Sequence, residues 1–201
     1  MDRTTLDAYD LHAADYAQDW FEQPPPDDMY ALLERYFEPG PTADIGCGAG
    51  RDVAWLARHG FDAFGYDGSA ALLDEARRRY PSLRFEPALL PTLAGVPSGA
   101  FRNVLCETVI MHLAPDEIEA AGARLVELLQ PGGVLYLSWR VTDGESQRDA
   151  RGRLYAAFDA QRVRSALGGA VSVLFDHEAL SESSGKRIHR IIVRRDARAA
   201  G

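Results

Sequence analysis

Residues 42–52 read TADIGCGAGRD, and this stretch decides the fold that we expect. Three alternating glycines, Gly46, Gly48 and Gly50, follow a short apolar run that contains one aspartate, Asp44. A glycine has no Cβ, so its backbone can turn with a positive φ and a ligand can approach the main chain closely. A helix after the loop would add unpaired N–H groups at its N-terminus. The stretch therefore predicts a strand, a ligand-binding loop and a helix, in that order.

The rest of the chain alternates between short apolar segments and segments of helical period. Ser69 is a plausible N-cap, and Pro115 suits the first turn of a helix. The expected strands are residues 42–46, 61–67, 83–86, 101–107, 134–139, 170–175 and 187–195. The expected helices are residues 50–59, 69–80, a segment from 115 to the QPGG turn at 130–133, and a helix around 148–167. This alternation predicts an α/β doubly wound sheet, in which ligands bind beyond the carboxyl ends of the strands.

A proline-rich segment, EQPPPDD at residues 22–28, interrupts the N-terminal region. Before it, residues 1–21 carry an apolar stripe and predict a helical arm; after it, residues 29–38 predict a second short helix. We expect one domain over residues 1–201, with an N-terminal arm or lid at 1–38 and a cofactor-binding core at 39–201.

Composition narrows the class of protein. The chain has 201 residues and a net charge of −8, which disfavours nucleic acid as a partner. Its two cysteines, Cys47 and Cys106, cannot form a disulfide framework. Neither has other potential metal ligands at a suitable spacing, so we expect no metal. We find no signal sequence and no apolar run that spans a membrane, and we expect a cytoplasmic protein. The oligomeric state stays open.

An aspartate, Asp67, ends the second expected strand, 21 residues after Gly46. A carboxylate at that place can accept hydrogen bonds from both hydroxyls of a ribose. Loop and carboxylate together predict an adenosine-type ligand. The dinucleotide fingerprint G-x-G-x-x-G would need its third glycine where Arg51 stands, which counts against a nicotinamide or flavin cofactor.

At these residues the chain resembles a known family. ADIGCGAGRD followed by GYDGSAALLDEARRR looks like the class I S-adenosylmethionine-dependent methyltransferases, and VIMHL and LLQPGGVLYLSW are similar to later parts of that family. The resemblance implies a Rossmann-like, mostly parallel sheet of seven strands with an antiparallel last strand and helices on both faces. It also implies S-adenosylmethionine as cofactor and S-adenosylhomocysteine as its product.

The resemblance also implies cofactor contacts. Asp44 would lie near the methionine amino group, Asp67 on the ribose and Gly68 beside the adenine, while Arg51 either reaches the cofactor carboxylate or is solvated. Relatives often carry an acidic residue where this chain has Leu89, so backbone groups at Leu89 and Leu90 would serve the adenine. The implied cofactor-binding residues are Asp44, Gly46, Cys47, Gly48, Gly50, Arg51, Asp67, Gly68, Leu89, Leu90, Cys106 and Glu107.

Catalytic residues are harder to infer, because a sulfonium is already activated and methyl transfer needs mainly positioning and exclusion of water. His112, after the fourth strand, is either a general base or a structural residue. Glu107, which ends that strand, is the second catalytic candidate. Arg140 either meets an anionic acceptor or is solvated. The expected lid residues, which can equally be packing residues, are Tyr9, Tyr16 and Trp20.

The resemblance therefore predicts an S-adenosylmethionine-dependent methyltransferase that acts on a small molecule. Two alternatives stay open. One is a protein that binds the cofactor or S-adenosylhomocysteine without turnover, and the other is an NAD(P)-dependent oxidoreductase.

Overall fold

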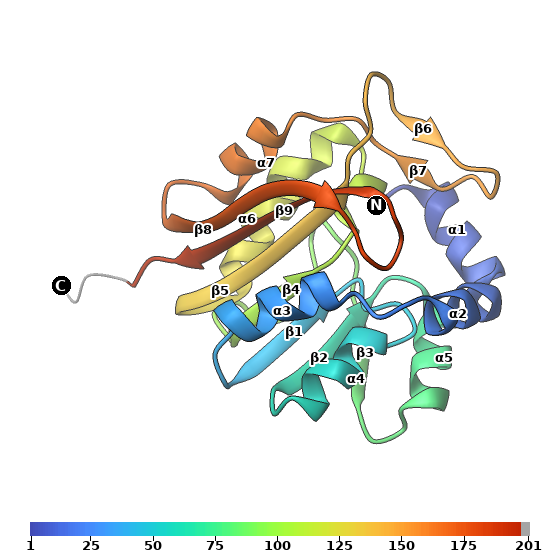
Figure 1. Ribbon diagram of the computed structural model, residues 1–201, viewed down its shortest axis with the longest axis horizontal. Coiled ribbons are helices and arrows are strands. Elements are labelled where there is room, and N and C mark those ends of the chain that lie inside the picture. Colours follow the sequence, from blue (N-terminus) through green and yellow to red (C-terminus); the bar gives the residue numbers. More distant parts are fainter. Residues whose placement is uncertain (198–201) are drawn as a thin grey trace.

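The structure is a computed structural model that describes residues 1–197. Its centre is a seven-stranded sheet with the strand order β3-β2-β1-β4-β5-β9-β8 (Figure 1). The strands are β1 (Pro41–Ile45), β2 (Asp62–Asp67), β3 (Arg84–Pro87), β4 (Phe101–Cys106), β5 (Leu129–Arg140), β8 (Val171–Leu180) and β9 (Arg187–Arg195). A separate two-stranded ribbon pairs β6 (Gln147–Arg148) with β7 (Leu154–Tyr155).

The sheet is parallel from β3 to β5, and β9 runs antiparallel to both of its neighbours, β5 and β8. The order reverses between β1 and β4, where successive connections leave toward opposite edges of the sheet. This arrangement confirms the predicted doubly wound, Rossmann-like α/β fold with an antiparallel last strand. It also places the loop after β1 at the position where such sheets bind ligands.

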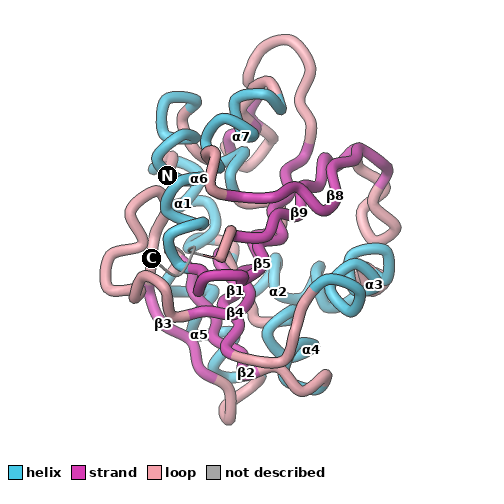
Figure 2. The backbone as a smooth tube through the Cα atoms, turned by 90° about the vertical axis from the view of Figure 1, so that its left-hand side faces the viewer, coloured by secondary structure: helices cyan, strands magenta, loops and turns pink. Residues whose placement is uncertain are grey.

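Helices cover both faces of the sheet, as Figure 2 shows. One hydrophobic cluster joins α3, α4 and α5 to strand residues such as Leu105 and Tyr136. The other joins α6 and α7 to the opposite face through Val104 and Leu135, because neighbouring residues of a strand point to opposite sides. The helices are α1 (Arg3–Leu11), α2 (Ala13–Glu22), α3 (Asp27–Tyr36), α4 (Arg51–Arg58), α5 (Ala70–Arg79), α6 (Ile118–Leu128) and α7 (Ala160–Leu167), with 3-10 turns at Ile110–His112 and Pro115–Glu117.

The predicted helix signals are present where the sequence places them. The Ser69 hydroxyl accepts a hydrogen bond from the Leu72 N–H at 3.2 Å and caps α5. Pro115 begins a 3-10 turn that leads directly into α6. Two strands are longer than predicted: β5 already begins at Leu129, and β8 continues to Leu180.

The prediction of a helix around residues 148–167 is wrong for the first half of that segment. Residues 147–155 form the β6–β7 ribbon, and only Ala160–Leu167 is helical. The Asp149 carboxylate accepts N–H bonds from Arg151 and Arg153, both at 3.0 Å, and this holds a tight turn. Gly152 has a φ of 88°, which a helix does not accommodate.

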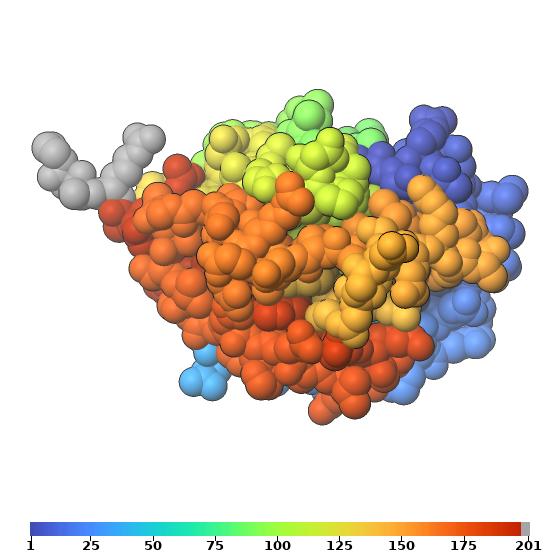
Figure 3. All heavy atoms as spheres, turned by 90° about the horizontal axis from the view of Figure 1, so that it is seen from above, coloured from blue at the N-terminus to red at the C-terminus, as the bar shows by residue number. Residues whose placement is uncertain are grey.

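The N-terminal arm consists of two helices, because helical structure is interrupted at His12, between α1 and α2. Its start lies against the β6–β7 ribbon, where Arg148 bonds both carboxylate oxygens of Asp2 at 2.8 Å. Figure 3 shows the N-terminal segment (blue) beside that part of the chain (orange). Only α1 and α2 form this arm at the strand ends, because α3 packs in the same cluster as α4. The division of the chain at residue 38 stays a prediction.

Helices α6 and α7 approach closely at Gly122, where an added Cβ would lie 2.6 Å from the Ala166 Cβ. We expect Gly122→Val to lower the free energy of unfolding by about 1–3 kcal/mol, because the helices must separate. Urea denaturation of the variant would measure the loss. Gly169→Val is the control, since a Cβ there meets nothing within 4 Å. A Gly122→Val protein as stable as this control would contradict the close packing.

Candidate functional site

A cavity of about 350 Å³ lies at the carboxyl ends of β1, β2, β4 and β5, under α1 and α2. Pockets of this size are typical of small-molecule sites. Tyr16, Asp44, Gly50 and Cys106 do not line it but are buried nearby. The other predicted site residues do line it, namely Tyr9, Trp20, Gly46, Cys47, Gly48, Arg51, Asp67, Gly68, Leu89, Leu90, Glu107, His112 and Arg140.

The glycine loop forms one wall of this cavity. Gly46, Gly48 and Gly50 have φ values of 78°, 52° and 82°, in the left-handed region that favours glycine. Side chains leave no room for a Cβ: one on Gly46 would lie 2.3 Å from Val109 Cγ2, and one on Gly48 would lie 2.8 Å from Trp20 Cζ3. The alternating glycines are therefore required both by the backbone conformation and by the close packing.

The Asp67 carboxylate ties this loop to the next strand. Its Oδ2 accepts the Gly48 N–H and its Oδ1 accepts the Ser69 N–H, each at 2.8 Å. Burial raises the pKa of Asp67, and these backbone donors oppose the rise. Each carboxylate oxygen can accept a further hydrogen bond, so Asp67 still has capacity for ligand hydroxyls.

Asp44, at the end of β1, is buried with its Oδ2 atom lacking any hydrogen-bond partner among the described residues. Burial raises its pKa well above the ordinary value, and the neighbouring acids Asp52 and Asp67 raise it further. An unpartnered buried acceptor is costly, and a cationic donor would satisfy it. The residues present therefore fit a ligand that carries an ammonium group near the glycine loop.

Two further residues that were predicted to contact the cofactor, Arg51 and Leu89, make contacts within the protein. Arg51 bonds both carboxylate oxygens of Asp52, at 2.9 and 3.1 Å, and Tyr30 donates its hydroxyl to the same carboxylate. Leu89 lies against Gly68, where a Cβ would be 2.2 Å from Leu89 Cδ1. Gly68 is therefore required for the apolar corner that Leu89 forms.

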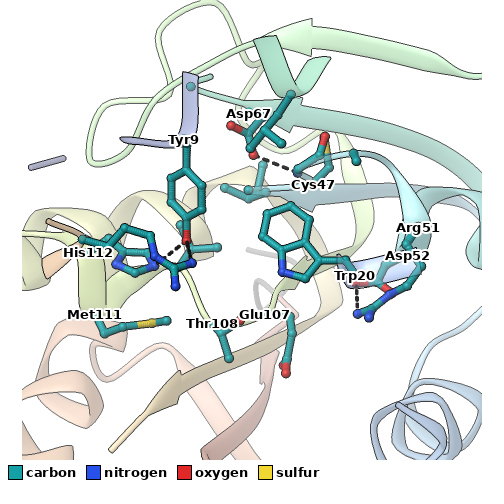
Figure 4. A pocket seen from close by; sticks show the side chains of 18 of the residues that line it. Tyr9, Trp20, Cys47, Arg51, Asp52, Asp67, Glu107, Thr108, Met111 and His112 are labelled. Carbon is teal, nitrogen blue, oxygen red and sulfur yellow. Dashed lines mark hydrogen bonds and ion pairs between the residues drawn. The ribbon is translucent and has the colours of Figure 1, made fainter. Parts of the chain in front are cut away.

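His112 and Tyr9 meet at the opposite side of the cavity, as Figure 4 shows. The Leu154 carbonyl lies 2.5 Å from His112 Nδ1, so that nitrogen carries the hydrogen. The neutral ring then presents Nε2 as an acceptor, and the Tyr9 hydroxyl donates to it at 2.9 Å. Burial lowers the pKa of His112 to about 4. His112 is thus a neutral imidazole with one defined tautomer, and Tyr9 lies on its acceptor side.

Glu107 follows β4, and its carboxylate accepts the Ser138 hydroxyl. Burial raises the pKa of Glu107, while Ser138 and Arg190 oppose the rise. The adjacent Thr108 N–H donates to the Ser138 oxygen at 3.0 Å. Ser138, on β5, therefore fixes both residues where β4 enters the cavity wall.

The aromatic residues of the arm form a stacked group above the loop. Tyr16 and Trp20 stack with ring centres 5.7 Å apart, and the Tyr9 ring meets Tyr16 at 5.1 Å. The Trp20 indole lies between Asp67 and Glu107 in Figure 4. Tyr16 is buried and packs in this group, whereas Tyr9 and Trp20 face the cavity.

Among the lining residues that sequence reasoning missed are Arg153, Tyr155 and Lys186. Arg153 pairs with Asp149 at 2.7 Å and lies over the Tyr16 ring at 4.6 Å. The prediction of a helix through residues 148–167 hid the first two, and Lys186 stands in a loop without a motif. Its only signal was that it is the one lysine of the chain.

Within residues 1–197 we find no cluster of three or more His, Cys, Asp or Glu side chains that would hold a metal ion. No helix of that range is both long and apolar enough to cross a membrane. Cys47 and Cys106 are free and buried.

Comparison with known sequences gives a methyltransferase domain family, whose model matches residues 43–133. A trans-aconitate 2-methyltransferase of Rhodopseudomonas palustris is 35% identical over 99 residues, which are 48% of this chain and 37% of the relative. The chain thus matches well under half the length of this curated relative.

Two solved structures share the fold. The 1,6-didemethyltoxoflavin-N1-methyltransferase of Burkholderia thailandensis, with 1,6-didemethyltoxoflavin and S-adenosylhomocysteine bound, is 21% identical with a TM-score of 0.74, over 96% of this chain and 88% of that one. The [4+2]-cyclase SpnF is 15% identical with a TM-score of 0.65, over 85% of this chain and 81% of that one. The glycine loop and the strand order agree with these findings: residues 43–133 match a methyltransferase domain, and the chain shares the fold of these solved structures.

Proposed function

We propose that this protein transfers a methyl group from S-adenosylmethionine to a small-molecule acceptor. The observation that carries the proposal is that the glycine loop and the Asp67 carboxylate share one cavity wall. The relative from Rhodopseudomonas palustris and the neighbour from Burkholderia thailandensis, both named as methyltransferases, support it. The cofactor supplies an activated methyl group on a positively charged sulfur.

The chain's own residues would hold that cofactor as follows. Asp67 would accept the ribose hydroxyls, and Asp44 would take the amino group of the methionine part, directly or through water. The loop from Gly46 to Gly50 would lie beside the methionine and ribose parts, with Cys106 and Glu107 near the sulfur. Gly68, Leu89 and Leu90 would border the adenine, and Arg51, paired with Asp52, would shape the loop.

Tyr9 and His112 are the pair that we propose for moving a proton. An acceptor hydroxyl or N–H would give its proton to the Tyr9 oxygen while the Tyr9 proton moves to His112 Nε2. The deprotonated acceptor would then have a lone pair free for the methyl group that the bound cofactor would supply. Burial raises the pKa of Tyr9, so the phenol keeps its proton until His112 takes it. Glu107 is the second catalytic candidate, and its proposed role is to face the positive sulfur.

A cofactor-binding protein without turnover is the second candidate function. The observation that favours keeping it is the neighbour SpnF, a [4+2]-cyclase with this fold, because it shows that the fold alone does not establish methyl transfer. An NAD(P)-dependent oxidoreductase is the less favoured alternative. Transfer of a labelled methyl group to any acceptor would decide for the enzyme. The cytoplasmic location stays a prediction, and no partner beyond the small molecule is proposed.

The cofactor assignment is tested by titrating the protein with S-adenosylhomocysteine in a calorimeter, with NAD as the comparison ligand. We expect Asp67→Asn to weaken binding about tenfold or more, because charge-assisted hydrogen bonds are lost. The matched control is Asp74→Asn, which changes an exposed aspartate of α5. Tighter binding of NAD than of S-adenosylhomocysteine would refute the assignment.

His112 gives a pH signature of its own. Its pKa in the folded protein is about 4 against 6.5 for an ordinary histidine, so the unfolded chain binds the proton first as the pH falls. The stability that the neutral buried ring contributes is complete above pH 6.5 and is lost toward pH 4. Relative to His112→Asn, we expect the wild type to lose about 2 kcal/mol of unfolding free energy by pH 5.

Urea denaturation from pH 4 to pH 8 measures this difference, and the shared carboxylate titrations cancel in it. His177→Asn, on the exposed part of β8, is the control for the loss of a histidine. Parallel curves for the wild type and His112→Asn would show that the ring is not held neutral.

A further inference from the structure

The cavity has a second end that the proposed cofactor does not use. It is bordered by Arg140 at the end of β5, by Tyr155 of the β6–β7 ribbon, and by Lys186 and Ile188 at the start of β9. We call these four residues the acceptor end. All four lie outside the segment 43–133 that matches the methyltransferase domain.

Strand register places Arg140 and Ile188 on one face of the sheet. Arg140 pairs with Ile188 across β5 and β9, and the Val141 N–H donates to the Arg187 carbonyl at 2.9 Å. Lys186 directly precedes β9 and lines the same cavity as Arg140. Arg187 points away and pairs with Glu178 at 3.1 Å. Two cationic side chains, those of Arg140 and Lys186, therefore border the acceptor end.

Arg140 is an unpaired cation. Its guanidinium lies 4.7 Å from the centre of the Tyr155 ring, and no carboxylate within residues 1–197 forms an ion pair or hydrogen bond with it. An arginine stacked on an aromatic ring keeps its in-plane N–H groups free, and these match the two oxygens of a carboxylate. Arg153, which also lines the cavity, differs in that Asp149 neutralises it at 2.7 Å.

Charge is divided across the cavity. The acids Asp44, Asp52, Asp67 and Glu107 gather at the loop and at the end of β4. Among the described residues that line the cavity, the arginine and lysine side chains without an acidic partner are Arg79, which lies over the Phe21 ring at 4.4 Å, and Arg140 and Lys186 at the acceptor end. The Tyr155 ring lies 4.7 Å from the Arg140 guanidinium, and Tyr9 and Trp20 add aromatic side chains to the lining of the same cavity.

We propose that the methyl acceptor is a small, planar organic carboxylate, whose carboxylate binds the Arg140 guanidinium with Lys186 beside it. The aromatic walls take the planar body of the molecule. That the bound carboxylate is a methyl acceptor rests on the proposed function. The binding of an anion at Arg140 does not depend on it. The site would select substrates by charge, because a neutral analogue leaves the Arg140 donors without a partner.

The test uses a matched pair of probes, benzoate and benzamide, which share shape and differ in charge. S-adenosylhomocysteine is first titrated alone, and each probe is then titrated into the saturated protein by calorimetry. We expect benzoate to bind at least about tenfold more tightly than benzamide, as charge-assisted hydrogen bonds predict. Its apparent dissociation constant should rise with salt.

Variants assign the effect to residues. Arg140→Gln should weaken benzoate about tenfold and leave benzamide unchanged, Arg140→Lys should restore part of the affinity, and Lys186→Gln should cost less than Arg140→Gln. Arg58→Gln, an exposed arginine at the end of α4, changes the net charge equally and should have no effect. Thermal melting shows that each variant is folded before its affinity is compared.

The outcomes separate the two proposals. Failure of S-adenosylhomocysteine to bind defeats the proposed function, and the probes are then titrated into the free protein, where the same Arg140 dependence still supports the anion site. Equal affinity for benzoate and benzamide overturns the carboxylate proposal, and so does a benzoate affinity that Arg140→Gln leaves intact. Tighter binding of phenyl phosphate than of benzoate overturns the assignment to a carboxylate.

Discussion

Two hydrogen bonds to the Asp67 carboxylate hold together the parts from which the cavity is built. One comes from Gly48 in the loop after β1, and the other from Ser69 at the start of α5. Ser69 in turn donates its hydroxyl to Asp10 of α1 at 2.6 Å. Loop, helix and arm thus meet around one partly buried acid. This arrangement explains why a carboxylate can remain there, since backbone donors offset the cost of its burial.

The parts of the structure that follow from local sequence were predictable. The loop at Gly46, Gly48 and Gly50 requires positive φ values, which glycine adopts readily. The cap at Ser69 depends only on the Leu72 N–H in the first turn of the same helix. Such features are determined within a few residues. The order of strands and helices follows from them, because apolar runs and helical periods leave few alternatives.

Features that depend on distant contacts were not predictable in the same way. Tyr9 and His112 form a pair across 103 positions of sequence, and no spacing rule connects them. The segment 147–155 has the composition of a helix, yet Asp149 binds the turn and Arg148 reaches Asp2 in the arm. Tertiary contacts decide the conformation of that segment, and with it the positions of Arg153 and Tyr155.

The contact between Trp20 and Gly48 gives the arm a thermodynamic role. The indole lies so close that a Cβ on Gly48 would be 2.8 Å from it. A ligand that takes this face of the loop must first displace the ring, and the free energy of that displacement is subtracted from its intrinsic affinity. The packing of α2 on α5, away from the cavity wall, would then set part of the dissociation constant of such a ligand. For a cofactor that binds at this loop as proposed, affinity would depend on the arm's equilibrium as well as on the residues that line the cavity.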